Sequence, residues 1–488
     1  MKFSSGLKPI WQSTLSRVIC NRRMATAATS STTPDYNGPS LEDVVAIRQK
    51  NLGPTLKYHF KTPVLIHNGK MQWLFDNNGK KYLDMFGGIV TVSVGHCHPK
   101  VNAALKNQVE TLWHTTNIYL HPKIHEFAEK LASKMPGDLK TVYFVNSGSE
   151  ANDLAMLLAR LHTKNFDILT FRNAYHGTSP YTMGLTAQSS WRYSLPGVNS
   201  GIQHVLNPDP YRGRWGGKNC RESSVQTTRD CDCSPNNCAA TQNYYQDLDE
   251  MFRYSIPVGK CAGMFAESIQ GVGGTVQFTK GYIKQAAELV RKNGGVFVSD
   301  EVQTGFGRTG SHFWGFESHD IIPDIVTMAK GIGNGFPLAA VVTTPQIAES
   351  LTQALHFNTF GGNPMASAVG IAVLEVIEEE KLQENSLEVG NYFLKGLAEL
   401  RSKFNIIGDV RGQGLMIGVE FVSDRDTRQP LSKEHFGKIW EECKDLGVLF
   451  GAGGFYGNVL RIKPPMCINK NDVDLALDVL ERSIKAHV

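Results

Sequence analysis

Short runs of apolar residues alternate along the middle of the chain with segments in which apolar residues recur at helical spacing. The apolar runs predict strands at residues 142–146, 167–171, 262–267, 295–300, 325–329 and 338–344. Strands that are apolar throughout are typical of a parallel sheet buried on both faces. We therefore predict an α/β fold with a mostly parallel sheet that helices cover on both sides, beginning near His98-Pro99.

The two ends of the chain have a different pattern. Residues 64–85 alternate between apolar and polar positions, with Asn68-Gly69 and Asn78-Gly79 as turns, which predicts a small antiparallel meander. Beyond Asn363-Pro364 the pattern predicts a mixture of helices and strands. The helices are expected at residues 365–380, 386–404, 433–446 and 471–487, and the strands at residues 414–422 and 459–462.

These patterns divide the chain into four expected regions. Residues 1–35 form a leader and disordered linker, and residues 36–95 an irregular arm followed by the meander. Residues 96–363 form the large domain, and residues 364–488 a smaller α+β domain that the meander joins.

The leader also explains the net charge. Its first 34 residues hold five basic residues and no acidic one, which exceeds the formal net charge of +4 for the whole chain. Leu7, Ile10, Trp11, Leu15 and Val18 recur at helical spacing, as in an amphipathic organelle presequence, so we expect a mitochondrial matrix protein; a disordered tail is the alternative. The nearly neutral remainder argues against nucleic-acid binding, and no apolar run is long enough to predict a membrane span.

Residues 208–246 form a long polar insertion, which we expect to be partly ordered at best. It holds four of the nine cysteines, namely Cys220, Cys231, Cys233 and Cys238. Metal binding, pairing and free thiols all remain open for them. Because their spacing differs from standard zinc patterns, we expect a surface loop of thiols without a metal.

Two residues at predicted strand ends carry the first sign of chemistry. Lys330 follows an apolar run and is succeeded by three glycines within five positions, and Asp300 ends the preceding strand thirty residues earlier. Consecutive parallel strands bring their carboxyl ends to one edge of a sheet, so we expect both side chains in one pocket. A partly desolvated lysine there has a lowered pKa and can form an imine with a carbonyl, although a solvated surface lysine is the simpler interpretation of this window alone.

Other polar residues belong to the same predicted edge. Gly148 and Ser149 open a helix, where free amides favour a phosphate, unless the turn is only a helix cap. Tyr175 or His176 can stack on a flat ring, and Glu267 and Gln303 follow other strands. A phosphate site, a stacking ring, a carboxylate and a lysine together suit pyridoxal phosphate, whose pyridine nitrogen needs an acid and whose aldehyde needs an amine.

Five segments resemble the class III (omega) aminotransferases, which have the fold type I of enzymes dependent on pyridoxal phosphate. They are Asn-Ser-Gly-Ser-Glu-Ala-Asn at residues 146–152, Ala-Tyr-His-Gly at 174–177, Asp-Glu-Val-Gln-Thr-Gly-Phe-Gly-Arg at 300–308, Ala-Lys-Gly at 329–331 and Asn-Thr-Phe-Gly-Gly-Asn-Pro at 358–364. The resemblance extends from about residue 56 to the C-terminus.

The resemblance implies a role for each matching residue. Lys330 is expected to bind the cofactor covalently and to carry protons, Asp300 to pair with the pyridine nitrogen, Gln303 to approach the phenolic oxygen, and Tyr175 to cover the ring.

It also implies residues that hold the phosphate and the substrate. Gly148 and Ser149 are expected to bind the phosphate, helped by Thr359 from the other subunit of a homodimer. Arg461 is expected to bind the substrate α-carboxylate, for which a guanidinium is suited. Glu267 matches an active-site glutamate, although the family's following proline is Ser268 here, which leaves the loop geometry open.

Within the family, the segments at residues 87–99, 212–217 and 305–315 are most similar to members that use alanine and glyoxylate. We therefore expect a ping-pong transfer of the amino group from alanine, or another α- or β-amino donor, to glyoxylate. An omega-amino acid transaminase, a phospholyase of the same family and a catalytically silent dimeric binding protein remain alternatives.

Overall fold

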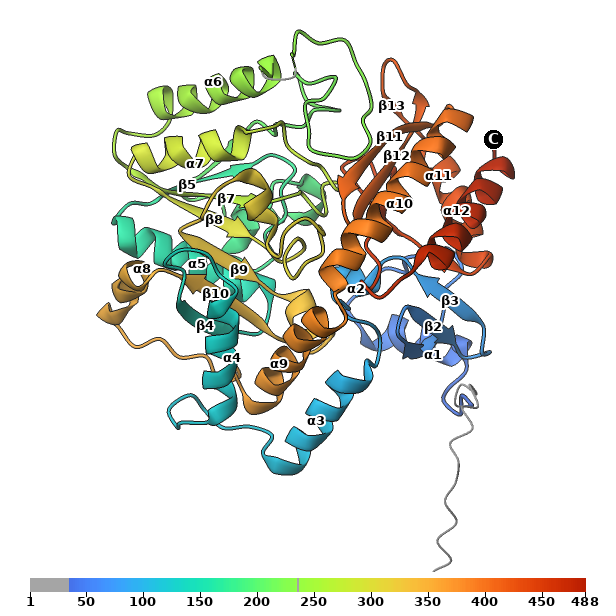
Figure 1. The fold of residues 1–488 in the computed structure, drawn as a ribbon, viewed down its shortest axis with the longest axis horizontal. Coiled ribbons are helices and arrows are strands. Elements are labelled where there is room, and N and C mark those ends of the chain that lie inside the picture. The colour runs from blue at the N-terminus through green and yellow to red at the C-terminus, as the bar shows by residue number, and fades with distance from the viewer. Residues whose placement is uncertain (1–34, 235–236) are drawn as a thin grey trace, which may run out of the picture. The chain divides into compact units, whose positions relative to one another are not determined.

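The computed structural model describes residues 35–234 and 237–488, so the expected presequence lies outside the described residues. A seven-stranded sheet forms the centre of the fold, in the order β4-β10-β9-β8-β7-β5-β6 (Figure 1). Its strands are β4 (Thr141–Val145), β5 (Asp167–Phe171), β6 (Ile202–Val205), β7 (Cys261–Glu267), β8 (Val296–Asp300), β9 (Ile325–Met328) and β10 (Ala339–Thr343). Only β10 runs against its neighbours, because it pairs antiparallel with both β4 and β9 while the other pairs are parallel.

Both faces of this sheet are buried at its central strands β7 to β10, where every residue is buried, which is why these strands are largely apolar. In β8, Val296 and Val298 pack in one cluster with α5 (Gly148–Thr163). Phe297 points the other way and packs with α6 (Ala239–Tyr254) and α7 (Tyr282–Lys292). The prediction of a mostly parallel, doubly covered sheet is therefore confirmed, and all six predicted strands are present.

Two smaller sheets come from the ends of the chain. A four-stranded sheet has the order β1-β2-β3-β14, and an antiparallel sheet has the order β11-β12-β16-β15 with β13 paired to β12. Because β14 pairs in parallel with β3, the N-terminal meander is joined to the C-terminal part of the chain. The strands are β1 (Ile66–Lys70), β2 (Trp73–Asp76), β3 (Lys81–Asp84), β11 (Ile407–Gln413), β12 (Met416–Asp424), β13 (Gln429–Pro430), β14 (Val448–Leu449), β15 (Gly451–Gly453) and β16 (Val459–Ile462).

The remaining helices surround these sheets (Figure 1). They are α1 (Leu41–Asn51), α2 (Gly87–Val90), α3 (Pro99–Thr111), α4 (Pro122–Ser133), α8 (Pro345–Glu349), α9 (Pro364–Glu379), α10 (Leu382–Lys403), α11 (Lys433–Asp445) and α12 (Lys470–Lys485). Short 3₁₀ helices are η1 (Thr182–Gly184), η2 (Ser189–Trp191), η3 (Gly315–His319), η4 (Lys330–Gly333) and η5 (Ser350–Gln353). Among the described residues, none of these helices combines the length and the apolar character that crossing a membrane requires.

Two local predictions at the N-terminal end are wrong. The expected irregular arm contains α1, which buries no residue and so lacks the apolar periodicity that would have revealed it; Ser40 caps it by accepting from the Asp43 backbone N–H. Asn68-Gly69 lies inside β1, and the turn falls at Met71-Gln72, since Lys70 pairs with Trp73. The Asn78-Gly79 turn is where the sequence predicts it, with Gly79 at a φ of 78°.

The insertion at residues 208–246 is more closely packed than predicted. Cys220 and Arg221 are buried, and Arg221 donates two hydrogen bonds of 2.8 Å to the carboxylate of Asp409 on β11. The expectation of a poorly ordered surface loop is therefore wrong for its described residues, because a charged side chain of this segment has its partner inside the small antiparallel sheet. Residues 35–488 form one compact unit, and the division into a large and a small domain stays a prediction.

Candidate active site

A cavity of about 340 Å³ opens at the carboxyl ends of the parallel strands. Glu267 ends β7, Asp300 ends β8 and Lys330 comes two residues after β9, and all three side chains line it. Since β7, β8 and β9 are parallel neighbours, their ends necessarily meet at this edge. The expectation that Lys330 and Asp300 face one pocket is confirmed.

Lys330 begins η4 in a left-handed backbone conformation, with a φ of 52°. Such a conformation is uncommon for a residue with a side chain and concentrates at functional sites. Burial lowers the pKa of the Lys330 ammonium and Arg461 adds to this, although the carboxylates of Asp300 and Glu267 act in the opposite direction. A lowered pKa increases the fraction of neutral amine available as a nucleophile.

Asp300 is held by three donors. Its Oδ2 accepts from Asn152 Nδ2 at 2.9 Å and from His176 Nδ1 at 2.8 Å, and its Oδ1 accepts from the Val302 backbone N–H at 3.0 Å. Burial by itself raises the pKa of this carboxyl, but the hydrogen bonds and the charge of His176 outweigh it, so that the net pKa is lowered. Asp300 is therefore a buried group kept as an anion. Sequence reasoning considered His176 only for stacking and gave Asn152 no role.

The N-terminus of α5 also lines the cavity. Ser147 caps the helix by accepting from the Glu150 backbone N–H at 3.2 Å, and Gly148 and Ser149 occupy its first turn. Backbone N–H groups there have no partner within the helix and attract an anion. Gly177 faces Ser149 so closely that a Cβ atom would lie 2.6 Å from Ser149 Oγ, which explains why only glycine fits.

Glu267 fixes the loops on either side of it. Its Oε1 accepts from the Tyr175 backbone N–H at 3.1 Å, and its Oε2 accepts from the Gly271 backbone N–H at 2.7 Å. Burial raises the pKa of its carboxyl. The loop is held even without a proline after Glu267, because buried Ser268 donates to Glu301.

Gln303 lines the cavity and has a partner that the sequence did not reveal. Lys463 Nζ donates to Gln303 Oε1 at 2.9 Å, and complete burial lowers the pKa of Lys463 well below its ordinary value. Lys463 lies two residues after Arg461, the alternation that places two side chains on one face of an extended segment. This two-residue spacing is the sequence feature from which Lys463 could have been predicted to lie near Arg461 in the site.

Arg461 is buried on β16 and retains an unused donor. Its Nε and Nη2 donate to the Ala452 carbonyl at 3.2 and 3.1 Å, whereas its buried Nη1 has no hydrogen-bond partner among the described residues. The guanidinium lies 5.0 Å from the centre of the Phe86 ring, and burial lowers its pKa to about 10. An incoming carboxylate would satisfy the free N–H.

Two of the expected site residues do not line the cavity. Arg461 lies near enough for its charge to act on the Lys330 ammonium and the Glu267 carboxyl, whereas Thr359 lies apart. It is exposed and is not among the residues that line the cavity. Its segment contacts another exposed one, since the rings of Phe360 and His114 lie 5.4 Å apart.

The donor set of the cavity fits pyridoxal phosphate. The first turn of α5 and Ser149 suit the phosphate, the anionic Asp300 suits a protonated pyridine nitrogen, and the Lys330 amine suits the aldehyde. Tyr175 is placed on the cavity wall, where its ring packs edge-to-face against Trp191.

Comparisons with known proteins agree with this chemistry. The family Aminotransferase class-III matches residues 57–484. The mitochondrial alanine–glyoxylate aminotransferase 2 of Homo sapiens is 55% identical over 454 residues, which cover 93% of this chain and 88% of the human one. A phospholyase from Arthrobacter in complex with phosphoethanolamine superimposes with a TM-score of 0.81 at 30% identity, covering 91% of this chain and 100% of that one. For an amine transaminase from an uncultivated Pseudomonas species in its PLP-bound form, the TM-score is 0.79 at 28% identity, with coverage of 90% and 98%.

Proposed function

Because this chain belongs to the class III aminotransferases, we propose that it transfers the amino group of alanine to glyoxylate, which yields pyruvate and glycine, with pyridoxal phosphate as its cofactor. The observation that carries the proposal is that Lys330 and Asp300 line one cavity, next to the N-terminus of α5. The 55% identity to an alanine–glyoxylate aminotransferase supports the choice of substrates.

The chain's own residues supply binding and proton transfer. Pyridoxal phosphate, when bound, supplies an aldehyde carbon that accepts amines and a protonated ring that withdraws electrons from it. Lys330 Nζ is the amine that would hold the cofactor through that carbon, and as a free amine it would take the α-proton of the substrate. Asp300 would keep the ring nitrogen protonated, since the lowered pKa of its carboxyl keeps this group an anion.

Arg461 orients the substrate. Its Nη1, which has no partner within residues 35–234 and 237–488, and the positive charge of its guanidinium favour an α-carboxylate in a position that presents the α-carbon to Lys330. Glyoxylate also carries a carboxylate, so the same arginine serves both halves of a ping-pong reaction.

A direct assay tests the proposal. Purified full-length protein loaded with pyridoxal phosphate should form pyruvate and glycine in equal amounts from alanine and glyoxylate, and alanine alone should change its visible absorbance. The same assay is repeated with omega-amino donors and with phosphoethanolamine in place of alanine. Release of phosphate from phosphoethanolamine without transamination would assign the chain to phospholyases instead, and no turnover with any of them would leave a silent binding protein.

We also propose a homodimer in the mitochondrial matrix. Trp113 and Phe357 are exposed apolar residues of the two segments that meet where Phe360 contacts His114, close to Thr359 in the chain, and exposed apolar surface is typical of a subunit interface. In a dimer, Thr359 would reach the phosphate of the partner's cofactor. Light scattering should give twice the chain mass, and Thr359→Ala should weaken cofactor retention. The human relative is named mitochondrial, and import of residues 1–35 fused to a fluorescent protein tests the location.

The region boundaries remain part of the proposal. Residues 96–363 would form the large cofactor-binding domain, and residues 36–95 and 364–488 the smaller one, a division that the pairing of β3 with β14 supports. Limited proteolysis should cut between these regions before it cuts within them.

A further inference from the structure

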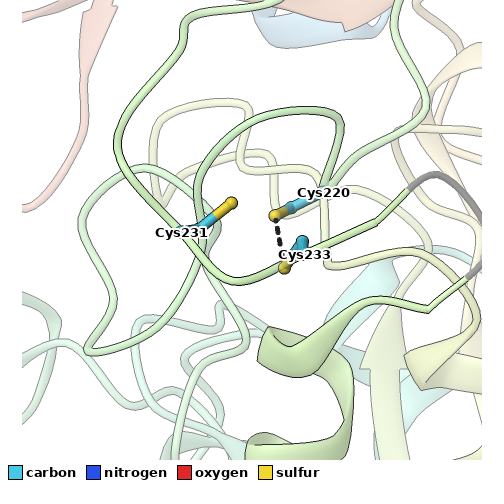
Figure 2. Close-up of side chains that lie close together, drawn as sticks. All are labelled: Cys220, Cys231 and Cys233. Carbon is cyan, nitrogen blue, oxygen red and sulfur yellow. Dashed lines mark hydrogen bonds between the residues drawn. The ribbon is translucent and has the colours of Figure 1, made fainter.

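A cluster of cysteine side chains lies in the insertion, outside the active-site cavity. The sulfur atoms of Cys220, Cys231 and Cys233 all lie within 4.8 Å of one another, and Figure 2 shows the three side chains gathered between loops of the insertion. Cys238 lies beside this group of three, because its sulfur is 3.6 Å from that of Cys233, the same distance that separates Cys233 from Cys220, although it is not within 4.8 Å of all three. Four thiols from 19 consecutive positions are thus brought together.

The spacing of the sulfur atoms fits a metal rather than a disulfide. Sulfur atoms of a disulfide lie about 2.05 Å apart, and all eight cysteines of the described residues are free. Four sulfur atoms placed 2.3 Å from a central zinc ion at the corners of a tetrahedron are separated by about 3.8 Å. The observed 3.6 Å is close to that edge.

Backbone geometry around the cluster maintains this arrangement. Ser234 and Asn237 exchange two backbone hydrogen bonds, of 2.9 and 3.2 Å, which hold Cys233 and Cys238 beside each other. Cys238 is also the N-cap residue of α6, where unpaired N–H groups favour a thiolate. On the other side, Gly217 approaches Cys231 so closely that a Cβ atom would lie 2.5 Å from its sulfur.

The site is enclosed by protein. Cys220 is buried, and the other three cysteines are half-buried against the apolar cluster of α6 and α7. With Cys238 as the fourth ligand beside the group of three, a zinc ion would have no open coordination site for a substrate, which is the arrangement of structural and not of catalytic zinc. Soft sulfur ligands in a tetrahedron favour zinc over magnesium or calcium.

We propose that Cys220, Cys231, Cys233 and Cys238 bind one zinc ion as a structural site. The ion replaces the four thiol protons, which are released to solvent, so that no oxidant or reductant is needed. The site fastens the insertion to α6 and fixes the position of Arg221, which follows Cys220 and bonds to Asp409. Asp409 also bonds to Arg411, and Arg411 contacts the Gly274 carbonyl in the loop that leads from Glu267. Through these hydrogen bonds, the zinc site stabilises the loop after Glu267, although it lies outside the active-site cavity.

Metal content tests the proposal on the full chain. Protein expressed with added zinc and loaded with pyridoxal phosphate should contain one zinc ion per chain by plasma mass spectrometry. Cys231→Ser should contain at least fivefold less and melt at a lower temperature. Cys97→Ser, which changes an exposed cysteine outside the cluster, is the matched control and should keep the full zinc content.

Two further measurements need no variant. A mercurial reagent that blocks thiols should release one zinc ion per wild-type chain to a metal-sensitive dye. Protein grown with cobalt should show the visible bands of tetrahedral cobalt and a thiolate charge-transfer band. Zinc content near zero, iron instead of zinc, or a disulfide within the cluster found by mass spectrometry would each overturn the proposal. None of these measurements requires transaminase activity, so a failure of the zinc proposal can be distinguished from a failure of the proposed transamination.

Discussion

His176 Nδ1 lies 2.8 Å from Oδ2 of Asp300, and both side chains are buried. A carboxylate can only accept, so the proton of this hydrogen bond belongs to the imidazole. His176 touches the carboxylate that is expected to meet the cofactor, and thereby acts as a positioning residue. Its Nε2 has no hydrogen-bond partner among the described residues, so the bond to Asp300 is the hydrogen bond that this ring makes there.

Replacing His176 should change the pH dependence of the reaction. In His176→Ala, Asp300 loses a donor that lowers its pKa, while burial continues to raise it. The pKa of the carboxyl therefore rises, and the acid limb of the kcat profile moves to higher pH, with kcat reduced roughly tenfold at neutral pH. His204→Ala is the control, because His204 bonds to the Gly184 carbonyl and does not line the cavity. An unchanged acid limb would contradict the role given to His176.

Replacing Lys330 should remove both covalent binding and proton transfer. Lys330→Ala should lower kcat by at least the roughly 10²- to 10⁴-fold that a positioned proton carrier contributes. Borohydride should attach the cofactor permanently to the wild type and to the exposed-site control Lys140→Ala, but not to Lys330→Ala. Circular dichroism should show the same fold in all three. Retained turnover in Lys330→Ala would refute the assignment.

Replacing Arg461 should affect substrates that carry a carboxylate. Arg461→Lys keeps the charge but loses the fork of N–H donors, and we expect kcat/KM for alanine to fall by about 10- to 100-fold, the effect of one or two charge-assisted hydrogen bonds. An amine donor without a carboxylate should react at nearly the wild-type rate. Arg482→Lys, at an exposed position on α12, is the matched control. Equal losses for both donors would mean that Arg461 serves the fold and not the substrate.

The buried pair of Arg221 and Asp409 should govern stability in acid. Burial by itself raises the pKa of Asp409, but the charges of Arg221 and Arg411 lower it far below its ordinary value. A carboxyl whose pKa is lowered by folding stabilises the protein above its unfolded pKa, and this contribution is lost as the pH falls below that value.

Breaking that pair leaves a buried charge without one of its partners. Arg221→Ala should cost about 3–5 kcal/mol in the free energy of unfolding, and acid unfolding should begin at a higher pH than in the wild type. The exposed pair of Arg482 and Asp478 gives the control, and Arg482→Ala should change stability by less than about 1 kcal/mol. Urea unfolding followed at several pH values measures both variants. Equal effects would contradict the importance of the buried pair.

Elements with strong apolar patterns were predictable from the chain. The predicted strand at residues 167–171 has the same bounds as β5, and the predicted helix at residues 365–380 differs from α9 by one residue at each end. Such segments are buried, so the pattern and the structure have a common cause. By contrast, α1 buries nothing, and the two-residue strand β14 forms only because β3 lies beside it.

The sequence by itself determined the alternating strands and helices, and with them the edge at which Lys330, Asp300 and Glu267 meet, because parallel strands bring their ends together wherever they occur. Only the tertiary structure decided which side chains surround those residues. His176, Asn152 and Lys463 reach their partners across loops and separate sheets, and contacts between positions 124 to 160 residues apart leave no local pattern in the chain. The four cysteines follow the same principle, since their irregular spacing concealed a compact cluster that the folding of the insertion brings together.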